Sequence, residues 1–197
     1  MKKLIMLAGL LVLILSSCSM PEAENVVMEI TDAAGNRFLR AQNQAVDFYF
    51  YYPENFILDI NAAMISIFIS NPEWVDNDLE TGRTLAFPVN PNISVTVFSR
   101  RGDIETAQQW WDEFVMPALG EIYQDMEIES SEDIIVAGYR GRKFVYSYTL
   151  GGREFRQAKV IFFRNNNVYH MIYTATASRF NTHLEVLGVV IETFAFR

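Results

Sequence analysis

Three runs of aromatic and β-branched residues between positions 142 and 176 dominate the hydrophobic pattern of this chain. Gly151 and Gly152 separate the first run from the second, and Asn165, Asn166 and Asn167 separate the second from the third. Runs of this composition, divided by turn residues, are typical of antiparallel strands joined by tight hairpins. The pattern therefore predicts a three-stranded antiparallel meander over residues 142–176.

Three earlier runs also have the composition of strands. They cover residues 46–52, 64–70 and 93–99, and the third shows the period-two alternation of a strand. The segment 71–92 between the second and third is rich in Pro, Asn and Asp. A loop of this length is unusual in a compact domain and is often functional, so we expect its aromatic residues, Trp74 and Phe87, to contact a protein partner.

The apolar positions at helical spacing predict a helix that begins after Thr106. Gln109 follows Thr106 by three residues, as in a capping box. Pro117 removes one backbone hydrogen bond within the pattern, which predicts a kink or break over residues 113–117. The apolar face of this helix is predicted to consist of Trp111, Val115, Ala118 and Ile122.

A second helix is predicted near the end of the chain, with Ser178 as its N-cap. Its apolar stripe consists of Phe180, Leu184, Leu187, Ile191 and Phe194. Both helices must bury one face, and the meander has apolar residues on both of its faces. The predicted fold class is therefore α+β, with helices packed on both faces of a central antiparallel sheet.

The first residues are typical of a secretory leader: two lysines, an apolar run over residues 4–15, and small residues before Cys18. Leu15-Ser16-Ser17-Cys18 resembles the bacterial lipobox, which predicts a lipid on the Cys18 thiol and a mature chain beginning there. The alternative is an ordinary signal peptide that happens to contain the one cysteine of the chain. The expected organisation is a lipoprotein signal peptide over 1–17, a tether and short extension over 18–45, and a folded domain over 46–197.

The net charge of the chain limits the classes of partner that it can bind. Removing the leader takes two lysines and no acids, which lowers the formal net charge from −8 to about −10. Such a surface is repelled by nucleic acid and by anionic lipid headgroups. We therefore expect no nucleic-acid partner, and attachment to the bacterial membrane from outside the cytoplasm through the lipid on Cys18.

The order of these elements resembles the PsbP-like fold, a family that includes the extrinsic oxygen-evolving subunit of photosystem II, its bacterial relatives and related bacterial lipoproteins. The resemblance covers roughly residues 46–196. It rests on an aromatic strand ending in Tyr52-Pro53, the strand 93–97, the helix from Thr106, the segment 134–143 leading into an aromatic hairpin, the strand 169–175, and the closing Ile191-Glu192-Thr193-Phe194. It implies a non-catalytic binding or assembly module, and it transfers no functional residue to this chain.

The candidate residues for chemistry are few. The chain has two histidines, His170 and His183, and no Gly-x-Ser-x-Gly nucleophile motif, so we predict no enzymatic activity. The acidic segment from Asp76 to Gly82 begins like a calcium loop, but Gly82 comes one place late and Phe87 replaces the closing glutamate. We predict no metal and no cofactor.

The meander carries a basic cluster, and an acidic cluster precedes it. The basic residues are Arg140, Arg142, Lys143, Arg153, Arg156, Lys159 and Arg164, and the acidic ones are Glu121, Asp125, Glu127, Glu129, Glu132 and Asp133. One interpretation is a basic patch, centred on Arg153 and Arg156, that contacts an acidic partner. The other, which the pattern favours, is that the two clusters face each other or are solvated.

Aromatic residues offer a further alternative. Tyr49, Tyr51, Trp110 and Trp111 could line a ligand groove, although aromatics at strand and helix spacing are more often core residues. The sequence therefore predicts a lipid-anchored module that binds a protein. Its alternative is an envelope lipoprotein that binds a small or polymeric ligand in a groove beside the 71–92 loop.

Overall fold

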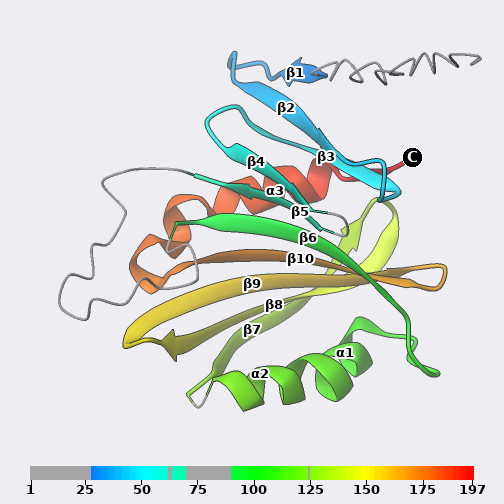
Figure 1. Ribbon diagram of the computed structural model, residues 1–197, viewed down its shortest axis with the longest axis vertical. Helices are drawn as coiled ribbons and strands as arrows, with labels where there is room; N and C mark the ends of the chain where they lie inside the picture. The colour runs from blue at the N-terminus through cyan, green and yellow to red at the C-terminus, as the bar shows by residue number, and fades with distance from the viewer. Residues whose placement is uncertain (1–27, 62–63, 70–89, 124) are drawn as a thin grey trace, which may run out of the picture.

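The computed structural model describes residues 28–61, 64–69, 90–123 and 125–197, which form two antiparallel sheets and three α-helices (Figure 1). The larger sheet has the strand order β4-β5-β6-β10-β9-β8-β7, and the smaller has the order β1-β2-β3-β11. The larger sheet consists of β4 (Ile57–Asn61), β5 (Met64–Phe68), β6 (Asn92–Ser99), β7 (Glu127–Val136), β8 (Tyr139–Leu150), β9 (Arg153–Arg164) and β10 (Asn167–Thr176), and the smaller of β1 (Glu29–Thr31), β2 (Arg37–Gln42), β3 (Phe48–Pro53) and β11 (Ala195–Phe196).

The predicted meander is confirmed as β8, β9 and β10, each of which pairs with the next in an antiparallel register. Gly151 and Gly152 form the β8–β9 turn with φ angles of 61° and 78°. Two successive positive φ angles define the hairpin turn whose twist matches that of the strands, and glycine adopts them without strain. The runs at 46–52, 64–70 and 93–99 correspond to β3, β5 and β6.

Residues 37–42, which the sequence assigned to the extension before the folded domain, form β2. Residues 38–42 of this strand pair with β3, and Ala41 is fully buried in the core. Asp32 closes the β1–β2 turn by accepting hydrogen bonds from the backbone N–H groups of Ala34 and Asn36, both at 2.9 Å. The folded part of the chain therefore includes the β1–β2 hairpin.

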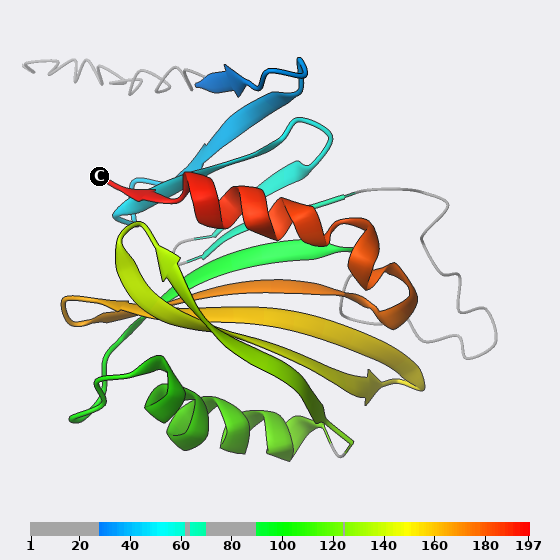
Figure 2. The ribbon, with the colours of Figure 1, turned by 180° about the vertical axis from the view of Figure 1, so that it is seen from behind.

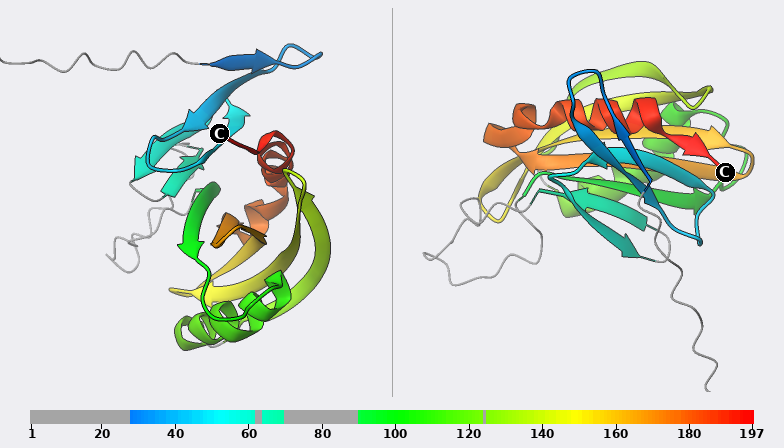
Figure 3. Two further views of the ribbon diagram at one scale, coloured as in Figure 1. Left: turned by 90° about the vertical axis from the view of Figure 1, so that its right-hand side faces the viewer. Right: turned by 90° about the horizontal axis from the view of Figure 1, so that it is seen from above.

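Both faces of the meander carry a hydrophobic core, as its pattern predicts. Helix α3 (Leu184–Thr193) packs on one face, where the β9 residues Ala158, Val160 and Phe162 point into the main core. The helical segment after β6 packs on the other face against Phe144 and Tyr146 of β8. Figures 1 and 3 show these helices on opposite sides of the strands, and Figure 2 shows the β7–β8 hairpin curving from one helix toward the other.

The helical segment after β6 begins as predicted and then departs from the α-helical pattern. Thr106 and Gln109 form the capping box, in which the Thr106 Oγ1 accepts a hydrogen bond from the Gln109 N–H at 3.1 Å. Helix α1 (Ala107–Trp110) continues into a π-helical segment (Trp111–Val115), and α2 (Met116–Ile122) follows with Pro117 in its first turn. The irregularity predicted from Pro117 is thus present as a π-helical turn.

This π-helical turn corrects the predicted apolar face. The Met116 N–H bonds to the Trp111 carbonyl five residues back, which places one extra residue in the turn. The buried face passes from Trp111 and Val115 to Leu119, while Ala118 is exposed and Ile122 is 62% exposed. Assigning Ala118 and Ile122 to the buried face is therefore wrong.

The predicted N-cap of the last helix is also wrong. Ser178 lies inside a 3₁₀-helical segment (Ala177–Thr182), and α3 begins after His183. The predicted apolar stripe of this helix is mostly confirmed, because its members Phe180, Leu187 and Phe194 are buried. Thr176 holds an extended conformation before the 3₁₀ turn, so the chain leaves β10 by a tighter turn than an α-helix would make.

Candidate functional site

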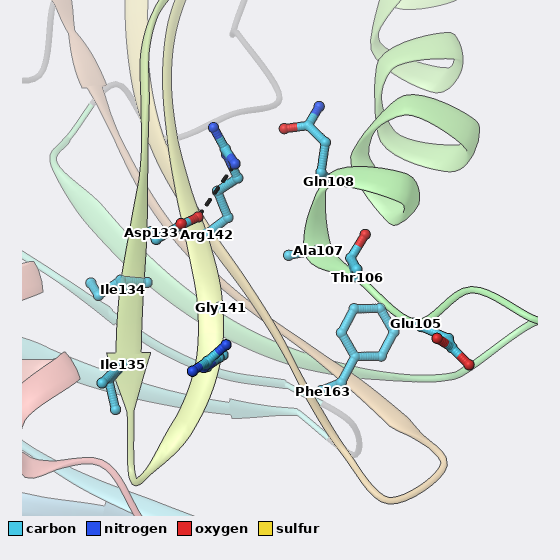
Figure 4. Close-up of a pocket in the computed structure, with 11 residues that line it drawn as sticks. Glu105, Thr106, Ala107, Gln108, Asp133, Ile134, Ile135, Gly141, Arg142 and Phe163 are labelled. Carbon is cyan, nitrogen blue, oxygen red and sulfur yellow. Dashed lines mark hydrogen bonds and ion pairs between the residues drawn. The ribbon is translucent and has the colours of Figure 1, made fainter.

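The first candidate site is a groove between the N-terminus of α1 and the β7–β8 hairpin, which we call the α1–β7 groove (Figure 4). It encloses about 670 Å³, a volume within the range of small-molecule and peptide sites. Residues Glu105–Gln108 form one wall, and Asp133–Ile135 of β7 with Arg140–Arg142 of β8 form the other. Phe163 of β9 completes the lining.

The most accessible apolar residue of this groove is Ile135, which is 67% exposed. β7 is the last strand in the order of the larger sheet, so one of its edges has no partner strand among the described residues. Arg140 lies opposite Ile135 in the β7–β8 register and makes no ion pair with a described residue. The groove therefore combines a free strand edge, an exposed apolar side chain and a cation, which suit an extended peptide segment.

The acidic and basic clusters pair with each other in part. Across β7 and β8, Arg142 pairs with Asp133 at 3.3 Å and Lys143 pairs with Glu132. These pairings favour the interpretation that the two clusters face each other rather than forming one basic patch.

Arg156 and Arg153 lie apart from the α1–β7 groove. Arg156 donates to both carboxylate oxygens of Glu129, with its Nε at 2.9 Å from Oε1, and its guanidinium lies 4.4 Å from the centroid of the Phe180 ring. Arg153 lines a separate depression of about 400 Å³ beside the 3₁₀-helical segment. The structure thus does not bring these two predicted contact residues to the groove.

Trp74, Phe87 and the acidic segment 76–82 lie outside the described residues, as does nearly all of the 71–92 loop. The calcium-loop alternative and the loop-contact prediction therefore stay predictions. Within the described residues, no group of three or more His, Cys, Asp or Glu side chains is placed to hold a metal ion.

The second candidate site, which we call the Lys159 cavity, lies between the helical segment and β6, β9 and β10. It encloses about 510 Å³. Trp110, Phe114 and Phe98 supply aromatic surface, and Lys159 and Arg101 supply positive charge. Among the described residues that line it there is no Asp or Glu.

Two buried titratable groups lie side by side in this cavity. Lys159 is 7% exposed, and burial lowers the pKa of its ammonium group from 10.5 to about 8. His170 is 6% exposed, and burial together with the nearby Lys159 charge lowers its pKa from 6.5 to about 3. At neutral pH the site therefore contains an ammonium cation beside an uncharged imidazole.

Aromatic rings hold the imidazole in place. The His170 ring centroid lies 4.8 Å from that of Phe98 and 6.1 Å from that of Trp110, the latter edge to face. Neither the His170 Nε2 nor the Trp110 Nε1 has a hydrogen-bond partner, although both atoms are buried. A buried polar group without a partner costs free energy, so such groups need an explanation.

The second histidine belongs to a different region. His183 lies at the start of α3, edge-on to Phe56 with the ring centroids 5.9 Å apart. The two histidines thus lie on opposite faces of the larger sheet. A histidine with a pKa near 3 is a weak general base at neutral pH, which gives His170 little capacity to activate a nucleophile.

Comparisons with solved structures define the class of fold. The yeast Ran-binding protein Mog1p (Saccharomyces cerevisiae) superposes with a TM-score of 0.57 at 9% identity, over 82% of this chain and 96% of its own. LpqN, involved in cell envelope biogenesis of Mycobacterium tuberculosis, gives 0.55 at 14% identity, over 85% and 88%. Cyanobacterial PsbP from Synechocystis sp. PCC 6803 gives 0.54 at 15% identity, over 81% and 92%.

These likenesses place the chain in the PsbP/Mog1-like fold, and the fold resemblance predicted from the sequence is confirmed. No family model matches the sequence, and no curated protein sequence does. A search of the described residues finds no helix with the length and apolar character needed to cross a bilayer.

Of the aromatic residues that the sequence offered for a ligand groove, Trp110 lines the Lys159 cavity, while Tyr49, Tyr51 and Trp111 do not. The other residues of both sites were missed, although a signal for one site was present. Period-two alternation along β9 places Lys159 on the same face as Phe155 and Ile161, both buried. A lysine at an inward position of a doubly covered strand is a signal of a buried cation. The α1–β7 groove had no comparable signal, because it depends on how α1 sits over the hairpin.

Proposed function

We propose that this protein is a lipid-anchored module outside the cytoplasm that binds a protein partner and has no catalytic activity. The observation that carries the binding role is the exposed Ile135 on the free edge of β7, beside a groove of about 670 Å³. An extended segment of the partner would add to β7 through main-chain hydrogen bonds. Side-chain selection would come from Ile135 and Arg140.

The N-terminal leader supports the proposed attachment to a membrane outside the cytoplasm. Lys2 and Lys3, the apolar run and Cys18 at its end are the features of a lipoprotein precursor. Lipid on Cys18 would hold an acidic domain at a surface that otherwise repels it. Residues 19–25 are small, polar and acidic and would serve as the tether.

Two proteins that share the fold support a role in binding. Mog1p is described as a Ran-binding protein, and LpqN as involved in cell envelope biogenesis. The first suggests that this fold presents a protein-binding surface, and the second suggests an envelope setting for a bacterial member. Trp74, Phe87, Arg153 and Arg156 stay proposed as further contact residues.

Photo-crosslinking in cells tests the binding role. A benzoylphenylalanine at position 135 is expected to give a discrete crosslinked species of higher mass. The same residue at position 122, which is 62% exposed on α2 away from the groove, is the matched control and is expected to give none. Arg140→Glu should weaken the crosslink at position 135. A probe at position 135 that captures nothing, or the same species as position 122, would contradict the proposal.

A further inference from the structure

The Lys159 cavity has an electrostatic character opposite to that of the chain as a whole. The protein carries a formal net charge of −8, yet Lys159 and Arg101 line this cavity without an acidic residue among the lining side chains. Lys159 is only 7% exposed, it lines the cavity, and its ammonium group makes no ion pair with a described residue. Buried cations in proteins are normally paired with an anion, and Lys159 has no such partner among the described residues.

Two other polar side chains that line the cavity also lack hydrogen-bond partners. The Trp110 indole can only donate a hydrogen bond, and its Nε1 is buried without an acceptor. The His170 Nε2 is also buried without a partner. Together with Lys159, the cavity thus offers two donor side chains and an imidazole, all without partners in the described structure.

Apart from Ser99, the rest of the lining is apolar. Phe98, Phe114, Val115, Leu119 and Ile172 surround the polar atoms, and the volume of about 510 Å³ lies in the usual range for small-molecule sites. A ligand that matches this surface has an apolar body and one anionic end.

We propose that the Lys159 cavity binds a single-chain fatty acid, with its carboxylate on Lys159 and its acyl chain against the aromatic side chains of the helical segment. The carboxylate is the acceptor that Lys159 and the Trp110 indole lack, and the chain covers the apolar lining. This site is separate from the α1–β7 groove and does not depend on the proposed protein-binding role.

The π-helical segment gives the cavity its shape. It carries the buried face from Val115 to Leu119, so Ala118 lies at the exposed edge of the cavity and lines it with only a methyl group. A regular α-helix would continue the stripe through Ala118 and Ile122, and their side chains would press against the sheet. π-Helical turns often occur at functional sites, where they re-aim side chains.

Calorimetric titration with laurate tests this inference. The mature chain from residue 18 with Cys18→Ser retains every described residue and needs no detergent that would compete for the cavity. We expect saturable, one-to-one binding of laurate below its micellar concentration. Dodecanol, which lacks the charge, should bind at least tenfold more weakly, and dodecyl phosphate should bind no better than laurate.

Three variants define the site. Lys159→Met should reduce laurate affinity about tenfold and leave dodecanol affinity unchanged. Lys143→Met is the matched control, because Lys143 pairs with Glu132 on β8 and lies outside the cavity, and it should bind like the parent chain. Ala118→Phe fills the exposed side of the cavity and should abolish binding of both ligands.

Several results would overturn the inference. They are no saturable laurate binding, equal affinity of Lys159→Met and the parent chain, or binding that Ala118→Phe does not change. A dodecyl phosphate affinity tenfold above that of laurate would assign the cavity to a phosphate amphiphile and overturn the carboxylate assignment.

Discussion

The Gly141→Ala variant is expected to lose about 3 kcal/mol of unfolding free energy. A Cβ at position 141 would lie 2.6 Å from the Ile161 carbonyl oxygen and 2.8 Å from the Phe162 Cβ. Both atoms are held by the β8–β9 ladder, in which Gly141 pairs with Phe162. Relief of the clash requires a shift of the β9 backbone, and the strand is buried on both faces there.

Urea unfolding followed by circular dichroism measures this loss, and Gly120→Ala is the matched control. A Cβ at position 120 meets nothing within 4 Å on the exposed side of α2. Because alanine is the better helix former, this control should gain about 0.5–1 kcal/mol. Equal stabilities of the two variants would show that β8 and β9 do not approach each other as described. A shift of the backbone at position 141 would also change the α1–β7 groove, because Gly141 lies in its wall.

The Lys159→Met variant is expected to be more stable than the parent chain by about 2–3 kcal/mol at pH 7. The folded-state pKa of Lys159 is about 8, against 10.5 for an ordinary lysine. Each unit of this difference corresponds to about 1.4 kcal/mol of cost for keeping the charged form buried. Methionine has a similar shape and no charge to desolvate, so the substitution removes that cost.

The pH dependence of this stability gain follows from the lowered pKa of Lys159 in the folded chain. The unfolded chain binds a proton at Lys159 up to about pH 10.5 and the folded chain only up to about pH 8, so the parent gains stability as pH rises between them. The advantage of Lys159→Met should therefore be full below pH 8 and shrink above it. Unfolding at pH 7 and pH 9.5 tests this.

Lys143→Met serves again as the control for this prediction, because its partly exposed pair with Glu132 predicts a change of less than about 1 kcal/mol. A destabilised Lys159→Met variant, or a gain independent of pH, would contradict an unpaired buried cation. A gain in stability together with weaker laurate binding is the pattern expected where a residue is kept for function at a cost in stability.

The strands and the class of fold are predictable from the sequence because their signals are local. The aromatic runs of the meander carry their own turn residues, such as Gly151 and Gly152, so hairpin pairing follows from neighbours along the chain. The division into two sheets does not follow, since β3 pairs with β11 at the far end of the chain. That pairing depends on the position of α3, which packs on β3 and carries Thr193, whose Oγ1 accepts a hydrogen bond from the Tyr51 N–H at 3.0 Å.

The buried face of the first helix shows a different limit of prediction from the sequence. Helical spacing assumes 3.6 residues per turn throughout, and the π-helical turn at Trp111–Val115 breaks this assumption. Pro117 signals a break, but not the extra residue that turns Ala118 outward. The Lys159 cavity is lined in part by this segment, whose deviation from the helical period no periodic pattern describes.

The measurement that tests the account most directly is the intact mass of the protein extracted from the membranes of its own cell. The account predicts a chain that begins at Cys18 and carries lipid on that residue. It also predicts that Cys18→Ser moves the protein from the membrane fraction to the soluble fraction. An unmodified Cys18, or a Cys18→Ser protein that stays equally bound to the membrane, would contradict the placement on which the proposed function rests.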